Sequence, residues 1–169
     1  VTRGLVRLHQ FSQEGRTYVL AYLGPGESLN LAACLDGGVN VATADACTDA
    51  TLYAIPTPQF EALMREYPTL SISVARQLAA EVRRLSGMAK ELALHPVSIR
   101  LARFLLANAE GEYPRRRWTQ EAIAANIGTV RDVVGRLLRS LAEEGLIRRE
   151  RGRIVVVDRK GLERQARGE

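Results

Sequence analysis

The segment 119–146 constrains the fold most, because it joins two helical patterns through a single glycine. Thr119 is a suitable N-cap, since its hydroxyl can accept a hydrogen bond from an amide of the first turn. The first helix is predicted over 120–126 and the second over about 130–144. Gly128 lies between them and can adopt the positive φ that a tight interhelical turn requires. This spacing predicts a helix-turn-helix unit.

The second predicted helix has one apolar and one charged face. Apolar residues recur at intervals of three and four on the side expected to be buried: Val134, Leu137, Leu138 and Leu141. The opposite side carries Arg131, Asp132 and Arg136 around the small Gly135. Arginine can donate two hydrogen bonds to guanine, and a carboxylate can accept one from cytosine. We therefore expect these three side chains to read bases in the major groove of double-stranded DNA. A merely solvated amphipathic helix would explain the charges but not the glycine turn.

A basic hairpin is predicted after this helix, with strands at 146–149 and 154–157 around a turn at 150–153. Its arginines suit contact with phosphates. Contacts with the DNA backbone are expected from five residues: Thr119, Thr129, Arg139, Arg151 and Arg153. The run Arg115–Arg117 either touches the backbone as well or is an ordinary solvated charge run.

The charge of the chain is divided unevenly along its length. Residues 1–94 hold 8 Lys and Arg against 9 Asp and Glu, whereas residues 95–169 hold 16 against 10. A nearly neutral first part joined to a basic second part indicates that only the second part meets a polyanion.

The first part of the chain is predicted to be a small antiparallel β unit. Alternating apolar and polar residues between turns predict four strands, at 4–10, 18–23, 39–44 and 51–55. A short helix is expected to open at Thr57, beside Pro58. Cys34 and Cys47 lie among small and apolar residues, which favours buried structural thiols over a redox-sensing pair.

A long helix is predicted from Pro68 to about His95, where Pro96 follows as a hinge. Its small and apolar residues recur at alternating spacings of three and four from Ser71 onward, in the manner of a heptad seam: Ala75, Leu78, Val82, Leu85, Ala89 and Leu92. We expect this seam to pair with a second copy of the chain. The alternative is a helix packed on its own domain.

Other classes of function are disfavoured. The sequence contains no phosphate loop, dinucleotide fingerprint or metal-ligand spacing, and its two histidines, His9 and His95, do not form a catalytic set. We therefore expect neither an enzyme nor a bound metal or cofactor. No apolar run approaches the length of a membrane span, and no signal peptide opens the chain, so a cytoplasmic location is expected.

Nearly the whole chain resembles the cyclic-AMP receptor protein / fumarate–nitrate reduction regulator (CRP/FNR) superfamily. The resemblance rests on the segments Thr119–Glu121, Ile127–Arg136, Glu144–Ile147, Glu14–Arg16, Tyr22–Glu27 and Leu35–Gly38. It implies an α+β fold in three parts: a partial antiparallel β-roll sensor domain over 1–67, a dimerisation helix over 68–94, and a winged helix-turn-helix over 95–169. It further implies a homodimeric transcription regulator on a palindromic operator, and an activator that recruits RNA polymerase. By position, Arg131, Asp132 and Arg136 match the family's base-reading Arg, Glu and Arg.

The resemblance also identifies departures in the sensor part. Glu27 aligns with a residue that binds ribose in cyclic-nucleotide-binding members. Asn40 and Val41 stand where those members have an Arg-Ser pair that clamps the phosphate, and they supply neither a cation nor a hydroxyl. The chain also begins inside the β-roll. We therefore expect regulation without cyclic AMP; the alternative is an effector-dependent regulator that senses haem, a small metabolite or redox state, with Glu27 and Asn40 as candidate contacts.

Overall fold

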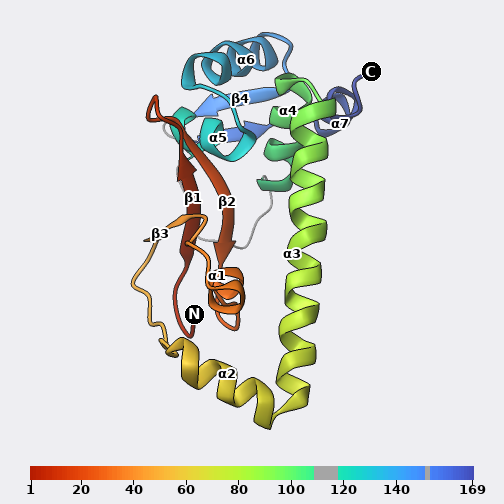
Figure 1. Cartoon of the computed structure of the whole chain (residues 1–169). Coiled ribbons are helices and arrows are strands. Elements are labelled where there is room, and N and C mark those ends of the chain that lie inside the picture. The colour runs from red at the N-terminus through yellow and green to blue at the C-terminus, as the bar shows by residue number, and fades with distance from the viewer. Residues whose placement is uncertain (109–117, 151–152) are drawn as a thin grey trace. The chain divides into compact units, whose positions relative to one another are not determined.

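The computed structural model describes residues 1–108, 118–150 and 153–169 (Figure 1). The chain divides into two compact units. The first contains Val1–Gln10 and Val19–Ala89, and the second contains Phe11–Tyr18 and Lys90–Glu169. The fold is mixed α and β, with antiparallel strands first, a long helix next and a helix-turn-helix last, as the sequence predicts.

A three-stranded sheet dominates the N-terminal part. It contains β1 (Val6–Phe11), β2 (Thr17–Leu23) and β3 (Thr43–Ala46), with β1 in the centre. β1 and β3 are antiparallel, and Arg7 lies opposite Asp45 in their register. In β2 the buried residues Val19 and Leu23 lie on one face, whereas in β1 the buried Val6 and His9 are three residues apart and lie on opposite faces.

Two of the four predicted strands need correction. The strand expected over 39–44 lies instead at β3, and the strand expected over 51–55 does not form. Thr51 makes only an isolated bridge with Arg3, and Tyr53 and Ile55 are exposed. A strand needs a neighbour along its length to satisfy its amides and carbonyls. Alternation alone does not reveal whether that neighbour is present.

Three helices complete the N-terminal part: α1 (Leu31–Asp36), α2 (Thr57–Glu66) and α3 (Pro68–Leu94). α2 begins at the predicted residue, with Pro58 in its first turn, where no amide donor is needed. α3 runs as one helix to the predicted hinge. Its side toward its own unit includes the buried Val74, whereas the predicted seam lies on exposed positions apart from the half-buried Leu78.

The C-terminal part is a helical core with a hairpin. Its elements are α4 (Val97–Asn108), α5 (Gln120–Ile127), α6 (Arg131–Glu143), β4 (Ile147–Glu150), β5 (Arg153–Val156) and α7 (Arg159–Arg167). α4 packs on α5 and α7, and α5 packs on α6. Leu101, Ile123 and Leu138 are almost completely buried where these helices meet.

The sequence patterns did not reveal α7, although its signals are local. Asp158 caps the helix by accepting a hydrogen bond from the Gly161 amide at 2.9 Å. Leu162 is completely buried in the core. Arg103 of α4 donates from Nε to the Ala166 carbonyl at 2.9 Å, which satisfies one of the free carbonyls at the end of α7.

The cysteines depart from expectation, because both are half-buried rather than buried. Cys34 Sγ lies 3.6 Å from the hydroxyl of Thr57. In the part of the chain that the structure describes, no helix has both the length and the apolar character needed to cross a membrane.

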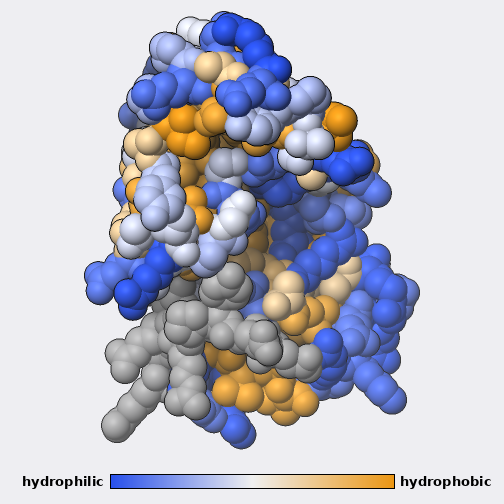
Figure 2. All heavy atoms as spheres, turned by 90° about the horizontal axis from the view of Figure 1, so that it is seen from below, coloured by the Kyte–Doolittle hydropathy of each residue, from blue (hydrophilic) through white to orange (hydrophobic). Residues whose placement is uncertain are grey.

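Figure 2 shows apolar patches among the hydrophilic side chains on one face of the molecule. The exposed large apolar residues of the chain include Tyr67 and Ile72.

Candidate nucleic-acid interface

The turn between α5 and α6 has the predicted geometry. Thr119 Oγ1 accepts a hydrogen bond from the Ala122 amide at 3.1 Å, which caps α5. Gly128 ends α5 in the left-handed region, with a φ of 68°. The Thr129 amide then donates to the Ala124 carbonyl at 3.0 Å. These bonds hold the start of α6 at a fixed place relative to α5.

α6 presents its charged face outward. Val134, Leu138 and Leu141 anchor the other face in the core, at 0%, 1% and 5% exposure. The residues predicted to read bases, Arg131, Asp132 and Arg136, are all exposed, as is Arg139. The apolar stripe therefore fixes the rotation of the helix and leaves the polar stripe toward solvent.

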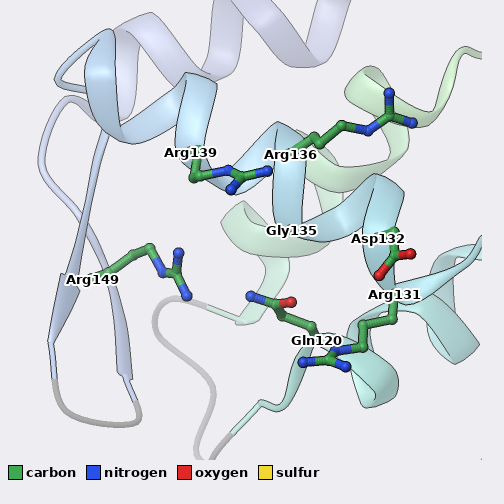
Figure 3. Close-up of a pocket in the computed structure, with 7 residues that line it drawn as sticks. All are labelled: Gln120, Arg131, Asp132, Gly135, Arg136, Arg139 and Arg149. Carbon is green, nitrogen blue, oxygen red and sulfur yellow. The ribbon is translucent and has the colours of Figure 1, made fainter.

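These charged residues border one shallow hollow of about 360 Å³ (Figure 3). It is lined by Gln120 of α5, by Arg149 of β4 and by five residues of α6: Arg131, Asp132, Gly135, Arg136 and Arg139. In Figure 3, Arg149 extends from its strand toward the carboxamide of Gln120, whereas Arg136 points away from it. Four guanidinium groups and one carboxylate give the hollow a strongly positive character, which suits a polyanion.

Gln120 lies against Gly135, the glycine on the exposed face of α6. A Cβ at Gly135 would be 3.1 Å from Gln120 Oε1 and 3.8 Å from Nε2. The carboxamide thus occupies the centre of the exposed face, where an amide can bind adenine or a phosphate. Sequence reasoning gave Gln120 no role, because only the packing of α5 on α6 brings it to Gly135.

Arg131 makes an ion pair across the turn. Its Nε lies 3.0 Å from Oε1 of Glu121, which is in the first turn of α5. Both side chains are about two-thirds exposed, at 65% and 64%. The ten-residue separation gives no helical-spacing signal, so the sequence alone did not predict this pair.

The structure describes most of the residues expected at the DNA backbone. Thr119 is exposed and keeps its hydroxyl hydrogen available for donation, while Thr129 is half-buried. α6 itself has no side-chain cap at Val130, so its first amides are available to an anion. Arg151 and the run Arg115–Arg117 lie outside the described residues.

The hairpin forms as predicted, from β4 and β5. The strands are antiparallel, with Arg149 opposite Ile154 and Glu150 opposite Arg153. Arg153 is exposed, and Arg148 is paired with Glu150 at 2.8 Å. Alternation along β4 implies that only one of its two arginines faces α6, and the structure identifies it as Arg149.

The seam predicted on α3 is largely accessible in the single chain. Val82, Leu85 and Leu92 are 63%, 42% and 42% exposed. Ala75 and Ala89 are also exposed, and Leu78 is half-buried.

The two candidate effector residues have different surroundings. The Glu27 carboxylate accepts a hydrogen bond from the Gly24 amide at 2.6 Å and so closes its own turn, while Asn40 is exposed. Within residues 1–108, 118–150 and 153–169, no cluster of three or more His, Cys, Asp or Glu is placed to hold a metal ion.

Two family matches cover most of the chain. Residues 1–67 match the cyclic nucleotide-binding domain, and residues 99–165 match the Crp-like helix-turn-helix domain. Among curated proteins, the cyclic AMP receptor protein of Thermus thermophilus is 34% identical over 99% of this chain and 78% of its own length. The transcriptional regulator SdrP of the same organism is 30% identical over 98% of this chain and 82% of its own length.

Solved structures of CRP/FNR-family proteins are also similar to this chain. A CRP/FNR-family protein from Eubacterium rectale superposes with a TM-score of 0.84 and 28% identity, over 99% of this chain and 79% of the other. A CRP/FNR-family transcriptional regulator from Thermus thermophilus gives 0.80 and 29%, over 99% of this chain and 86% of the other.

Proposed function

This chain belongs to the CRP/FNR family of transcription regulators, and from that membership we propose that it binds a palindromic operator as a homodimer without cyclic AMP. The family consists of regulators rather than enzymes, and the C-terminal part of this chain is a helix-turn-helix DNA-binding domain. The observation that carries the proposal is the positive hollow on the exposed face of α6.

In the proposed complex, α6 lies in the major groove. Arg131 and Arg136 donate to guanines and Asp132 accepts from cytosine, since their side chains occupy the exposed N-terminal half of the helix. Asp132 is shorter by one methylene than the family's usual Glu, so it contacts a base only at closer approach. The expected phosphate contacts come from five residues: Thr119, Thr129, Arg139, Arg151 and Arg153.

The homodimer is proposed to form through α3. Val82, Leu85 and Leu92 of its seam are exposed in the single chain, whereas Val74 faces the chain's own unit. Burying this seam against a second copy would remove it from water. Two-fold symmetry would place the two recognition helices in successive major grooves, about 34 Å apart.

Each of three parts of the chain is proposed to have its own role. Residues 1–67 form the effector-type domain, 68–94 the dimerisation helix and 95–169 the DNA-binding domain, in keeping with the two family matches. Acting on DNA as an activator, the dimer would contact RNA polymerase in the cytoplasm.

Independence from cyclic AMP is proposed on the chemistry of the sensor part. A cyclic nucleotide carries a phosphate, and Asn40 and Val41 offer no positive charge at the position of the family's phosphate clamp. The Glu27 carboxylate accepts a hydrogen bond from the Gly24 amide and adds a negative charge, which does not favour a phosphate. The alternative is an effector-dependent regulator, which the domain match of residues 1–67 and the name of the Thermus thermophilus cyclic AMP receptor protein favour.

A random-library selection of duplex DNA tests the proposal, with purified protein at near-physiological salt. Recovery of a palindrome with guanines in each half-site, with or without added cyclic AMP, is the expected result. Enrichment only with cyclic AMP would overturn the ligand-independent version and leave the DNA-binding function intact. Mass spectrometry and an absorption spectrum of the freshly purified protein would detect a bound metabolite or haem, which would favour the effector-dependent alternative. Enrichment of no DNA sequence under any condition would contradict the proposed DNA binding.

A further inference from the structure

We propose that Glu121 is a positioning residue that sets how Arg131 reads its base, an inference that rests on the proposed DNA binding. The observation is the ion pair between the two helices of the motif, with Arg131 Nε 3.0 Å from Glu121 Oε1. A side chain outside the recognition helix thereby acts on the most N-terminal of the arginines proposed to read bases.

Glu121 is well placed for this role by its own helix. It lies in the first turn of α5, where the free amides and the helix dipole favour a carboxylate. α5 is in turn fixed by the buried Ile123 and by the Thr119 cap. The carboxylate is thus attached to a rigid element, while Arg131 is a long side chain that would otherwise sample many rotamers.

The atoms that form the pair determine which donors remain for DNA. A guanidinium has five N–H donors in a fixed plane. Nε is the guanidinium nitrogen that pairs with the Glu121 carboxylate, so the two terminal nitrogens remain available to the DNA. These two nitrogens can donate together to O6 and N7 of guanine. The pair therefore favours an end-on approach of Arg131 to the base.

The same carboxylate also repels the DNA backbone. Glu121 is exposed beside the hollow that is proposed to meet the DNA, so its negative charge opposes every duplex regardless of sequence. Removing the charge should therefore have two effects of opposite sign. Affinity for random DNA should rise, while discrimination at the base read by Arg131 should fall. A purely structural role would lower both together.

The test uses the full chain and the operator obtained by selection. The base pair read by Arg131 is first identified with Arg131→Ala. Dissociation constants are then measured for the operator, for the operator changed at that base pair, and for a random duplex. In Glu121→Gln, we expect discrimination at that base pair to fall about two- to tenfold, the range for exposed and neighbouring coupled pairs. Binding to the random duplex should tighten.

The chain offers a matched control in α7. Arg159 Nε and Glu163 Oε1 form an exposed pair at the same 3.0 Å, so Glu163→Gln removes one charge and one ion pair away from the hollow. It should leave discrimination unchanged. Glu121→Asp keeps the charge but shortens the reach, and should lose discrimination without the gain on random DNA.

Several outcomes would overturn the inference. Unchanged discrimination in Glu121→Gln would contradict it, as would an equal loss in the Glu163→Gln control. A further loss of discrimination when Glu121→Gln is added to Arg131→Ala would show that Glu121 acts independently of Arg131. If the wild-type protein itself prefers no sequence, the proposed function fails and this inference fails with it.

Discussion

Gln120 Oε1 lies 3.1 Å from the position that a Cβ on Gly135 would occupy, so the carboxamide packs closely against this bare stretch of α6. This contact joins α5 to the exposed face of α6 at the centre of the hollow (Figure 3). A glycine within a helix costs stability, which makes its position here informative. Its absent side chain leaves room for the carboxamide.

Replacing Gly135 by alanine should separate stability from DNA binding. The free energy of unfolding should rise by up to about 1 kcal/mol, because alanine favours the helix. Gln120 Oε1 is the end of a flexible side chain and has to move only slightly, so the fold should tolerate the methyl group. Affinity for the operator should nevertheless fall about tenfold, because the methyl group and the shifted carboxamide crowd the face that is proposed to meet the DNA, and overpacking of a fitted surface costs about 1–3 kcal/mol. Denaturant unfolding and fluorescence anisotropy on labelled operator measure the two quantities.

Gly87→Ala is the matched control, because Gly87 also lies within a helix and a Cβ there would meet nothing within 4 Å. It should gain similar stability without loss of affinity. If Gly135→Ala binds the operator as tightly as this control, the packing of Gln120 has no part in binding.

Local signals predicted most of the DNA-binding domain. The Thr119 cap, the left-handed Gly128 and the apolar stripe around Val134 are each set by nearby residues, and each appears where it was expected. Such features depend on backbone geometry and periodicity, which the sequence displays directly.

Contacts across elements were not predicted. Glu121 meets Arg131, and Gln120 meets Gly135, only because α5 and α6 cross at a particular angle and rotation. The strand expected over 51–55 was wrong for a related reason, since strand formation depends on a partner elsewhere in the chain. A single sequence carries the preference of each element but not the identity of its neighbour.

Replacing Arg136 by alanine should reduce discrimination between bases, whereas replacing Arg153 by alanine should reduce affinity for every duplex. Arg136→Ala should lose about 1–3 kcal/mol of discrimination at one base pair in each half-site. Arg153→Ala should weaken all sequences alike and lower the slope of log affinity against log salt by about 0.9 per lost phosphate contact. Titrations at several salt concentrations, on operator and random duplex, distinguish them; a sequence-dependent loss in Arg153→Ala would contradict its assignment to the backbone.

Gly128→Ala should destabilise the protein more than Gly145→Ala. Both glycines have positive φ, 68° and 74°, so both substitutions carry strain of about 1 kcal/mol. Only at Gly128 would the new Cβ meet a close neighbour, 2.6 Å from Leu92 Cδ2, whereas Gly145 has open space. Urea unfolding should give about 1–3 kcal/mol of additional loss at Gly128. Equal losses would mean that Leu92 moves aside freely.

Asp45 should make stability depend on acid pH. Its pKa lies below the usual 3.8, chiefly because Arg7 donates a hydrogen bond to Oδ2 at 2.6 Å. Since the folded state favours the ionised carboxylate, the contribution to stability is complete above the unfolded pKa. It is lost as pH falls through the lower folded-state pKa.

Unfolding free energies of wild type and Asp45→Asn measure this contribution from pH 7 to pH 3. The difference between the two should stay constant down to about pH 5 and shrink at lower pH, where the unfolded carboxylate also takes up its proton. Arg7→Gln should abolish most of the same dependence, because it removes the donor. A difference that grows on acidification would have the wrong sign and would exclude this account.

Leu85→Asp should prevent dimer formation, because it places a charge in the seam that is proposed to be buried between two copies of α3. Leu85 is 42% exposed in the single chain, so the substitution should leave the fold of each protomer intact.

Ile72→Asp is the control: Ile72 is 53% exposed on the same helix but lies outside the seam. In analytical ultracentrifugation, wild type and Ile72→Asp should sediment as dimers and Leu85→Asp as a monomer. The monomer should bind a half-site and the full palindrome with nearly equal affinity, since the second recognition helix is no longer attached. A dimeric Leu85→Asp protein that still prefers the palindrome would move the interface away from this seam.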